Sequence, residues 1–195
     1  MKTIDARGKS CPLPVILTKK EIDAGENNII TIVDNETAKL NVGKLASKFA
    51  YNTKLEEKND GIYIELFKET NVDKDIEIVD NSTKINSCIV LGSDKLGKGS
   101  EELGNILMKS FIYTITETKP YPNFMVFLNS GVKLTTKGSE VIEDLKKLVE
   151  EGVKIVSCGT CLDFFEIKGN LEVGEISNMY DIVEMINNSD NTITV

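Results

Sequence analysis

The chain has 195 residues, 41% of them hydrophobic and 28% charged, which is typical of a globular protein with a buried core. It contains no histidine, so a Cys-His pair, a Ser-His-Asp triad and a histidine-ligated metal site are excluded. The net charge of −8 comes from residues 71–195, which hold 12 basic and 20 acidic side chains, and this acidity argues against nucleic-acid binding. No apolar stretch could span a membrane and the first residues are unlike a signal peptide, so we expect a cytoplasmic location.

Residues 1–70 have the pattern of a two-layer βαβαββ sandwich, with two helices on one face of a small mixed sheet. Strands are predicted over 3–5, 29–33, 53–58 and 62–68, the last two joined by a hairpin turn. The first helix is predicted over 12–23, and Asp34-Asn35 is expected to cap the second. The apolar face of the second helix is predicted to contain Ala38, Val42, Leu45, Ala46 and Phe49.

Residues 71–84 are polar and acidic, and we interpret them as a linker between a domain of residues 1–70 and a domain of residues 85–195. Strands and helices then alternate, which predicts a doubly wound parallel α/β domain. Strands are predicted over 85–91, 124–128, 153–157, 173–176 and 192–194. The helices between them are expected to bury Leu103, Ile106, Leu107, Phe111 and Ile115, then Val141, Leu145, Leu148 and Val149 after a cap at Thr135 or Thr136, then Met179, Ile182, Val183 and Ile186.

The motif Cys11-Pro12-Leu13-Pro14 begins the first predicted helix. Because proline favours the first helical turn, the motif predicts Cys11 at the N-cap, Pro12 at the first helical position and Pro14 at the third. Pro14 has no N–H, so the Leu13 amide is left facing the sulfur. The positive end of the helix and the nearby Arg7 would lower the pKa of Cys11 and favour a reactive thiolate. The alternative is a small buried cysteine that precedes a proline-started helix.

Three loops of the second half follow predicted strands, over residues 92–99, 129–133 and 158–161. Parallel sheets bind ligands at the carboxyl ends of their strands, so we expect these loops to share one edge. The first loop nearly matches a phosphate-binding loop, but Gly99 stands where a magnesium-binding Ser or Thr is required, so a mobile glycine-rich turn is favoured over nucleotide hydrolysis. The candidate anion or ligand residues of the first two loops are Asp94, Lys95, Gly97, Lys98, Asn129, Gly131 and Lys133.

The third loop contains two cysteines, Cys158 and Cys161, at a strand-to-helix junction. Their spacing suits a redox or sulfur-handling pair, and the helix start can supply amides to a thiolate. A zinc half-site would need ligands from a second subunit, so no metal is expected, and two structural cysteines remain a further alternative. Cys88 lies inside an apolar strand and is expected to fill the core.

Asp5-Ala6-Arg7-Gly8, followed by the motif at Cys11, resembles the CPxP signature of the TusA/SirA family of sulfur carrier proteins over residues 1–70. The second half resembles the DsrE-like domains in residues 91–94, 128–134 and 157–162. The two in this order resemble the YedF-type proteins associated with selenium metabolism, across nearly the whole chain.

The resemblance implies that Cys11 carries a persulfide, accepted from a cysteine desulfurase-like donor and passed to an acceptor protein. The YedF type suggests selenium as an alternative cargo, handed towards selenophosphate synthesis. The DsrE-like half implies homo-oligomerisation and a second thiol station at Cys158 or Cys161.

We therefore predict a sulfurtransferase-like carrier, with Arg7 stabilising the Cys11 anion and no cofactor. Two alternatives are a thiol-disulfide oxidoreductase that uses Cys158 and Cys161, and a non-catalytic partner-docking or regulatory protein.

Overall fold

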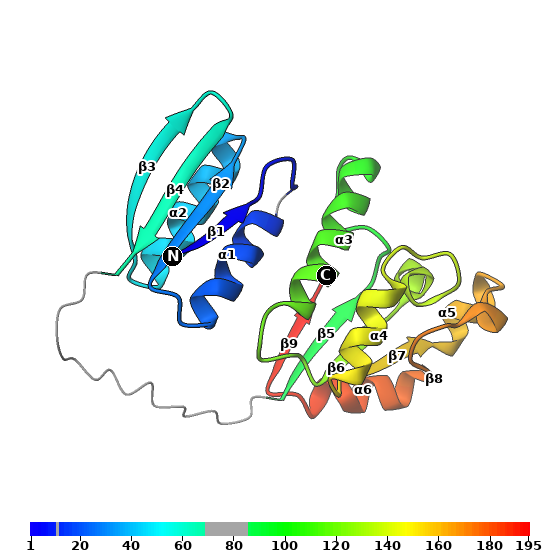
Figure 1. The fold of residues 1–195 in the computed structure, drawn as a ribbon. Helices are drawn as coiled ribbons and strands as arrows, with labels where there is room; N and C mark the ends of the chain where they lie inside the picture. The colour runs from blue at the N-terminus through cyan, green and yellow to red at the C-terminus, as the bar shows by residue number, and fades with distance from the viewer. Residues whose placement is uncertain (11, 69–85) are drawn as a thin grey trace. The chain divides into compact units, whose positions relative to one another are not determined.

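The computed structural model describes residues 1–10, 12–68 and 86–195, which form parts of two compact units, Met1–Ile78 and Val79–Val195. Each unit has its own sheet (Figure 1) and its own hydrophobic core. The predicted linker over 71–84 lies outside the described residues. None of the helices in the described ranges is long and apolar enough to cross a membrane.

The first unit is a four-stranded mixed sheet with the strand order β1-β2-β4-β3. Strands β1 and β2 are parallel, whereas β4 is antiparallel to both of its neighbours. Helices α1 and α2 cover one face of this sheet (Figure 1), as the sequence predicts. The elements are β1 (Lys2–Asp5), α1 (Leu13–Asp23), β2 (Asn28–Val33), α2 (Glu36–Lys48), β3 (Asn52–Lys58) and β4 (Gly61–Phe67).

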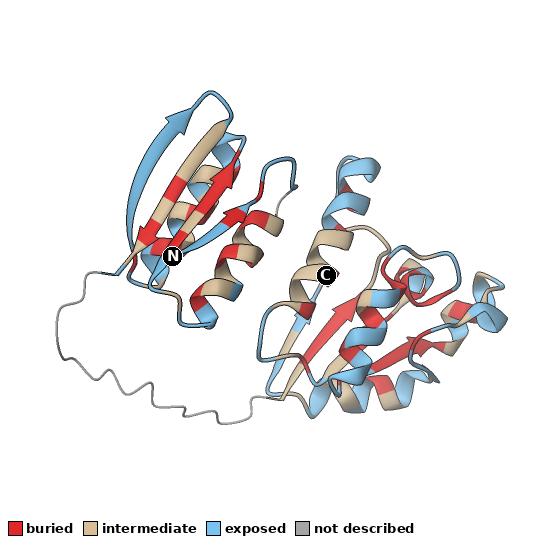
Figure 2. Ribbon diagram, in the orientation of Figure 1, coloured by how far each residue is buried: buried red, intermediate tan, exposed pale blue. Residues whose placement is uncertain are grey.

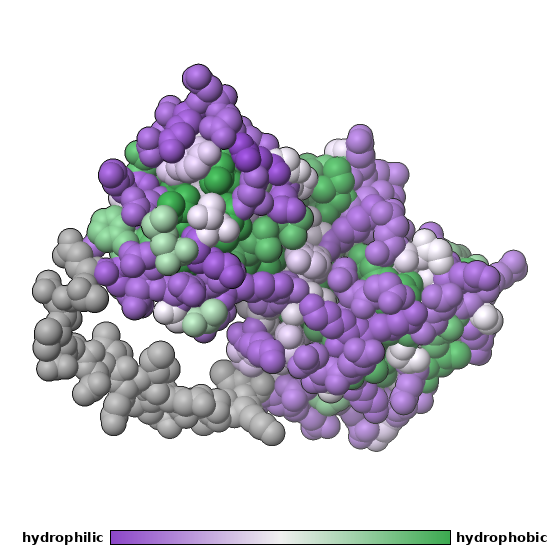
Figure 3. Space-filling view, viewed as in Figure 1, coloured by the Kyte–Doolittle hydropathy of each residue, from purple (hydrophilic) through white to green (hydrophobic). Residues whose placement is uncertain are grey.

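Local sequence explains this unit well. The side chain of Asn35 accepts a hydrogen bond from the Ala38 N–H and caps α2, as predicted. Strand β3 is exposed along its whole length, and hydrophilic side chains cover much of the face seen in Figure 3. The buried core lies between the helices and the sheet and contains Ile4, Ala6, Ile22, Ile29, Val33, Ala38, Val42, Ala46, Tyr51, Ile64 and Leu66.

The second unit is a five-stranded, entirely parallel sheet with the order β8-β7-β6-β5-β9. Its strands are β5 (Ser87–Leu91), β6 (Phe124–Phe127), β7 (Lys154–Cys158), β8 (Glu175–Ser177) and β9 (Asn191–Thr194). Its helices are α3 (Glu101–Thr116), α4 (Ile142–Glu150), α5 (Gly159–Phe164) and α6 (Met179–Asn187), with short 3-10 turns η1 (Asn129–Thr135) and η2 (Lys168–Asn170). The three central strands are largely buried in Figure 2.

The predicted doubly wound architecture is confirmed, because separate clusters cover the two faces of the sheet. On one face Ile89 and Leu91 pack with Met108 and Ile112 of α3. On the other face Cys88 packs with Ile182 of α6. Adjacent residues of β5 point to opposite faces of a strand, so both faces of this sheet must be apolar and covered.

The inward face predicted for α3 is wrong. Leu103, Ile106 and Leu107 are 53%, 54% and 40% exposed, whereas Met108 and Ile112 are buried. Phe111 and Ile115 are only partly buried against the core. This helix is apolar on more than one side, so its periodicity does not select the buried face. The side of α3 that carries Gly104 lies close to the preceding loop, where the Gly104 carbonyl accepts from the Leu96 N–H, while Met108 and Ile112 pack into the core.

Two further expectations about helices are corrected. Thr135 and Thr136 do not cap α4: both lie at the end of η1, and Val141 precedes the first turn of α4. Val149 of α4 and Met179 and Val183 of α6 were expected to be buried but are exposed, Val149 by 43%. Ile182 of α6 is buried, as predicted. The turn η1 was not predicted, because its sequence has the composition of an ordinary loop.

Candidate functional site

The first candidate region surrounds the motif at the start of α1, although Cys11 itself lies outside the described residues. Helix α1 begins at Leu13, and Pro12 occupies the cap position. The Leu13 N–H donates to the carbonyl of Ser10 at 3.0 Å. The prediction that Pro12 is the first helical residue is therefore wrong by one position, whereas the predicted contact between the Leu13 amide and the Cys11 sulfur stays a prediction, because Cys11 lies outside the described residues. Pro14 stays in the first turn, where it costs no hydrogen bond.

Arg7 anchors the segment that leads to this motif. Its guanidinium forms a two-pronged interaction with Asp5, through Nε to Oδ1 at 2.9 Å and Nη2 to Oδ2 at 2.6 Å. Its Nη1 also donates to the carboxylate of Asp60 at 2.9 Å. The hydrogen bonds from Arg7 lower the pKa of Asp5 to about 2, so this carboxylate is charged at neutral pH. Arg7 is thus held by two carboxylates and anchors this segment, and its stabilisation of the Cys11 anion stays a prediction, because Cys11 lies outside the described residues.

A third carboxylate, that of Asp34, also binds the segment that precedes Cys11. The Gly8 N–H donates to Oδ2 of Asp34 at 2.5 Å, and this hydrogen bond lowers the pKa of Asp34. Gly8 has a φ of 68°, a backbone conformation that glycine adopts without a Cβ penalty. The segment before Cys11 is therefore fixed to the ends of β1 and β2 and to the β3–β4 turn.

A small cavity of about 70 Å³ lies beside this segment. Residues on both sides of Cys11 in sequence line it, together with the first turn of α2. Its walls are mostly polar or small and consist of Lys9, Ser10, Pro14, Val15, Asn35, Thr37, Ala38 and Asn41. The motif at Cys11 is thus flanked by a polar recess large enough for a few atoms.

In the second unit, the three predicted loops meet at the carboxyl edge of the sheet. The Asp94 N–H donates to Oγ of Ser130 at 3.2 Å, and this hydroxyl donates to the Asp94 carboxylate at 3.0 Å. The Asn129 N–H donates to Sγ of Cys161 at 3.2 Å. The loops that follow β5, β6 and β7 are therefore joined into one structure.

Cys158 and Cys161 lie where the sequence places them, at the end of β7 and in the first turn of α5. Cys158 is buried, while Cys161 is partly exposed, and both thiols are free. Burial and a side-chain hydrogen bond with Cys158 raise the pKa of Cys161, although the Asn129 N–H acts in the opposite direction. The start of α5 therefore does not make Cys161 a resting thiolate, which corrects the expectation of helix-end activation.

The residues that were predicted to bind an anion or ligand differ in their surroundings. Lys95 forms an ion pair with Glu101 at 2.9 Å, whereas Lys98 is exposed. Gly97 has a φ of 83° and supplies a turn. A Cβ at Gly131 would overlap the carbonyl oxygen of Leu91, so this glycine allows η1 to pack against the end of β5. Gly97 and Gly131 therefore have evident structural roles.

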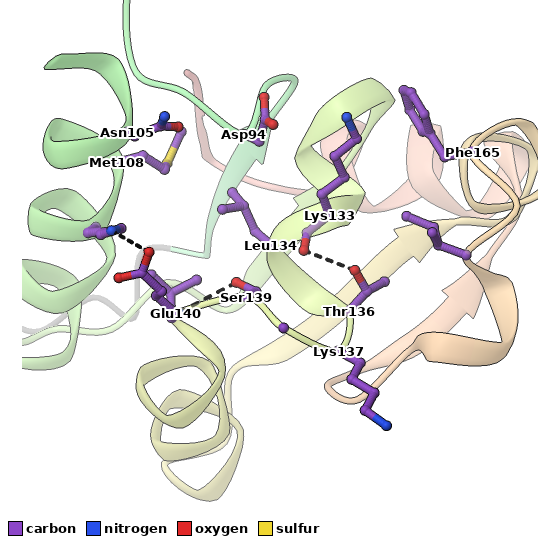
Figure 4. Close-up of a pocket in the computed structure, with 14 residues that line it drawn as sticks. Asp94, Asn105, Met108, Lys133, Leu134, Thr136, Lys137, Ser139, Glu140 and Phe165 are labelled. Carbon is purple, nitrogen blue, oxygen red and sulfur yellow. Dashed lines mark hydrogen bonds and ion pairs between the residues drawn. The ribbon is translucent and has the colours of Figure 1, made fainter. Parts of the chain in front are cut away.

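Asp94 and Lys133 also line a larger cavity of about 650 Å³ on the face of the sheet that α3 and α4 cover. Figure 4 shows Asn105 and Met108 reaching into it from α3, and Lys133 extending towards Phe165. Of its lining residues, sequence patterns did not indicate Asn105, Lys109, Lys137, Ser139, Glu140 and Phe165. They belong to α3, to the segment between η1 and α4 and to the end of α5, so no short motif links them.

Similarity to known proteins agrees with this division into two units. Residues 2–68 match the family described as sulfurtransferase TusA, and residues 116–195 match the DsrE/DsrF-like family. A solved SirA-like protein from Desulfitobacterium hafniense is 37% identical, and the match covers 34% of this chain and 95% of that chain with a TM-score of 0.32. The chain joins a TusA/SirA-like domain to a DsrE-like domain. These families are related to sulfur transfer, so a general role as a sulfur carrier follows.

Two solved structures resemble the DsrE-like domain at low identity. The ychN protein from E. coli is 15% identical, with 56% of this chain and 99% of that chain covered and a TM-score of 0.45. A protein of unknown function from Methanobacterium thermoautotrophicum is 19% identical, with 56% and 98% covered and a TM-score of 0.43. No curated protein matches the chain. Within the described part of the chain, no group of three or more Cys, Asp or Glu side chains is placed to hold a metal ion.

Proposed function

We propose that this protein carries sulfane sulfur, or selenium, on Cys11 and passes it to an acceptor protein. The observation that carries the proposal is the match of residues 2–68 to the TusA family together with the motif Cys11-Pro12-Leu13-Pro14. The anchored segment before Cys11 and the polar recess beside it support this role, because a carrier must present its cargo in a fixed place. A cytoplasmic location belongs to the proposal, since loading requires a reduced thiol.

The loading step is an exchange between sulfur atoms. The Cys11 thiolate attacks the outer sulfur of a persulfide on a cysteine desulfurase-like donor. The bond between the donor cysteine and that sulfur breaks, and the donor cysteine leaves as a thiolate. Cys11 then holds the outer sulfur as a persulfide. The same exchange with a selenium-loaded donor gives the selenium counterpart, which an enzyme of selenophosphate synthesis could consume.

Mass spectrometry of the full chain after incubation with a desulfurase and cysteine tests this proposal. The expected result is the added mass of one sulfur atom on the peptide that contains Cys11, and its loss in Cys11→Ser. Cys88→Ser is the matched control, because Cys88 is fully buried and should not affect loading. Loading that persists in Cys11→Ser, or an unmodified Cys11 in the wild type, would overturn the proposal. Selenocysteine in place of cysteine tests selenium as cargo.

The pair in the DsrE-like domain supports a second step. Transfer of the outer sulfur to Cys161 would let the Cys158 thiolate attack Sγ of Cys161, which forms a disulfide and releases hydrosulfide. Cys158 is close enough to contribute to the raised pKa of Cys161, which supports an exchange between the two sulfur atoms. The same pair could instead work as a thiol-disulfide oxidoreductase without Cys11. Hydrosulfide release from the loaded protein that stops in Cys158→Ser supports the relay, whereas disulfide cycling that is unchanged in Cys11→Ser supports the oxidoreductase.

Self-association through the DsrE-like domain is a further part of the proposal. The exposed apolar residues Leu103, Ile106 and Leu107 lie within two turns of α3. A contiguous apolar surface on a helix is typical of a protein–protein contact. We therefore propose that copies of the chain associate through this part of α3.

A further inference from the structure

The 650 Å³ cavity of the DsrE-like domain is separate from the cysteine chemistry. Neither Cys158 nor Cys161 lines it. Its volume lies within the range of about 300–1,000 Å³ that is usual for small-molecule sites. It also lies beside strand ends of a parallel sheet, where α/β domains bind ligands.

The charges of the cavity are partly compensated within the protein. Glu140 pairs with Lys109 at 2.6 Å, and the Asp94 carboxylate accepts the hydroxyl hydrogen of Ser130. Within the described residues, neither Lys133 nor Lys137 has a carboxylate partner. The ionisable residues that line the cavity are Asp94, Lys109, Lys133, Lys137 and Glu140, so the lining carries one net positive charge in a half of the chain that is strongly acidic.

Lys133 is held in place without losing its capacity to bind an anion. Its Nζ lies 4.6 Å from the centre of the Phe165 ring. A cation–π contact of this kind restrains the ammonium group but leaves its N–H donors available. Figure 4 shows this side chain directed towards Phe165 at the edge of the cavity.

Two further polar side chains of the cavity, Ser139 and Asn105, can donate hydrogen bonds to a ligand. Ser139 accepts the Val141 N–H through Oγ at 3.4 Å, so its hydroxyl hydrogen is left for a ligand. Asn105 adds an amide group. Below these groups, Met108 and Val141 are almost fully buried, and the partly buried Phe165 and Ile167 offer the apolar surface that a ligand can contact. The cavity thus combines ammonium and hydroxyl donors with a hydrocarbon surface.

From this combination we propose that the DsrE-like domain binds a small organic anion, whose carboxylate or sulfonate contacts Lys133 and whose apolar body lies against Phe165 and Ile167. The ammonium group of Lys133 makes the site selective for a negatively charged ligand. Lys137 adds to the positive potential at the mouth. This site does not depend on the sulfur carrier role of Cys11.

A pair of fluorescent probes that differ only in charge tests the proposal. 8-Anilinonaphthalene-1-sulfonate has the anionic group, and N-phenyl-1-naphthylamine is the same body without it. Titration of the full chain should give a lower Kd for the sulfonate. In Lys133→Gln the Kd of the sulfonate should rise about 5- to 10-fold, as the loss of one charged contact predicts, while the Kd of the neutral probe stays constant. Lys133→Arg should retain most of the affinity.

Lys154→Gln is the matched control, because it removes an exposed lysine from the other end of β7 without touching the cavity. Amide chemical shifts during the titration locate the probe, and the largest changes are expected at Gly138, Ser139 and Phe165. A Kd for the sulfonate that is unchanged in Lys133→Gln, an equal loss in Lys154→Gln, or shifts confined to the outer face of α3 would each overturn the proposal.

Discussion

The Asn129 N–H donates to Sγ of Cys161 at 3.2 Å, so η1 directly contacts the more accessible thiol of the DsrE-like domain. Asn129 has a φ of 47°, a conformation that asparagine tolerates better than most residues. The same turn contains Ser130, which bonds to Asp94. The position of Cys161 is therefore set by a turn that follows a different strand from its own.

The reactivity of Cys161 should increase with pH over an unusually high range. Burial and the Cys158 thiol raise its pKa, so little thiolate is present at neutral pH. Alkylation by iodoacetamide, followed by peptide mass spectrometry in a Cys11→Ser background, should show an inflection above the ordinary cysteine value. Cys158→Ala should move this inflection down without bringing it below that value, because burial is the larger cause. An inflection on the acidic side of the ordinary value would contradict the prediction.

Arg7→Gln should raise the pKa of Asp5 from about 2 towards its ordinary value of 3.8. Because the folded pKa is lowered, the stabilisation from this pair is complete above the unfolded pKa and is lost as the pH falls through about 2. The difference in urea midpoint between wild type and variant should thus be greatest above pH 4 and shrink in acid. Carbon-13 titration of the carboxyl group measures the pKa directly.

Lys54→Gln is the control for that experiment, since it removes one positive charge from the exposed strand β3. Its Asp5 titration curve should match the wild type. A pKa that does not move in Arg7→Gln would mean that the contact between Arg7 and Asp5 does not form in solution.

Gly131→Ala should destabilise the DsrE-like domain by about 2–3 kcal/mol, because the new Cβ would overlap the Leu91 carbonyl and backbone must move. Gly43→Ala is the opposite case: Gly43 lies inside α2 with open space around its Cβ position, so we expect about 0.5–1 kcal/mol of stabilisation. Chemical denaturation, followed by hydrogen exchange at individual residues, measures the free energy of unfolding of each domain separately. Equal effects of the two substitutions would contradict the close packing of η1.

Ile106→Glu should weaken self-association of the full chain. Ile106 is 54% exposed on α3, so a charge there is compatible with the fold but not with a buried contact between copies. Sedimentation equilibrium should show a lower mean mass at the same concentration. Leu40→Glu, at a 60% exposed position of α2, should leave the mass unchanged. A wild-type protein that is monomeric at all concentrations would refute the proposed association.

The fold was largely predictable because its signals are local. Asn35 caps α2 as its position before a helical pattern indicates, and Ile89 and Cys88 lie in a continuous apolar strand that must be covered on both faces. The outer face of α3 was not predictable. Its apolar residues occupy several sides of the helix, so periodicity alone does not select the buried one.

In the candidate sites too, the features that depend on local sequence were predicted and those that depend on distant residues were not. Cys158 and Cys161 were correctly placed at a strand-to-helix junction, because the spacing and the preceding apolar run are local features. The contact of Arg7 with Asp60 was not predicted, since the two residues lie 53 positions apart in sequence. Lys133 was correctly selected as an edge residue, but its contact with Phe165 depends on packing that no short motif records.

The anchoring of Arg7 and Gly8 has a consequence for protein engineering. The octapeptide from Arg7 to Pro14 is contiguous, yet the groups that hold its first residues come from Asp5, Asp34 and Asp60. Transplanting the octapeptide alone into another scaffold would leave a guanidinium and a backbone amide without acceptors. A functional graft would need to include three carboxylates, from the end of β1, the residue after β2 and the β3–β4 turn, so the portable unit is the whole sheet edge.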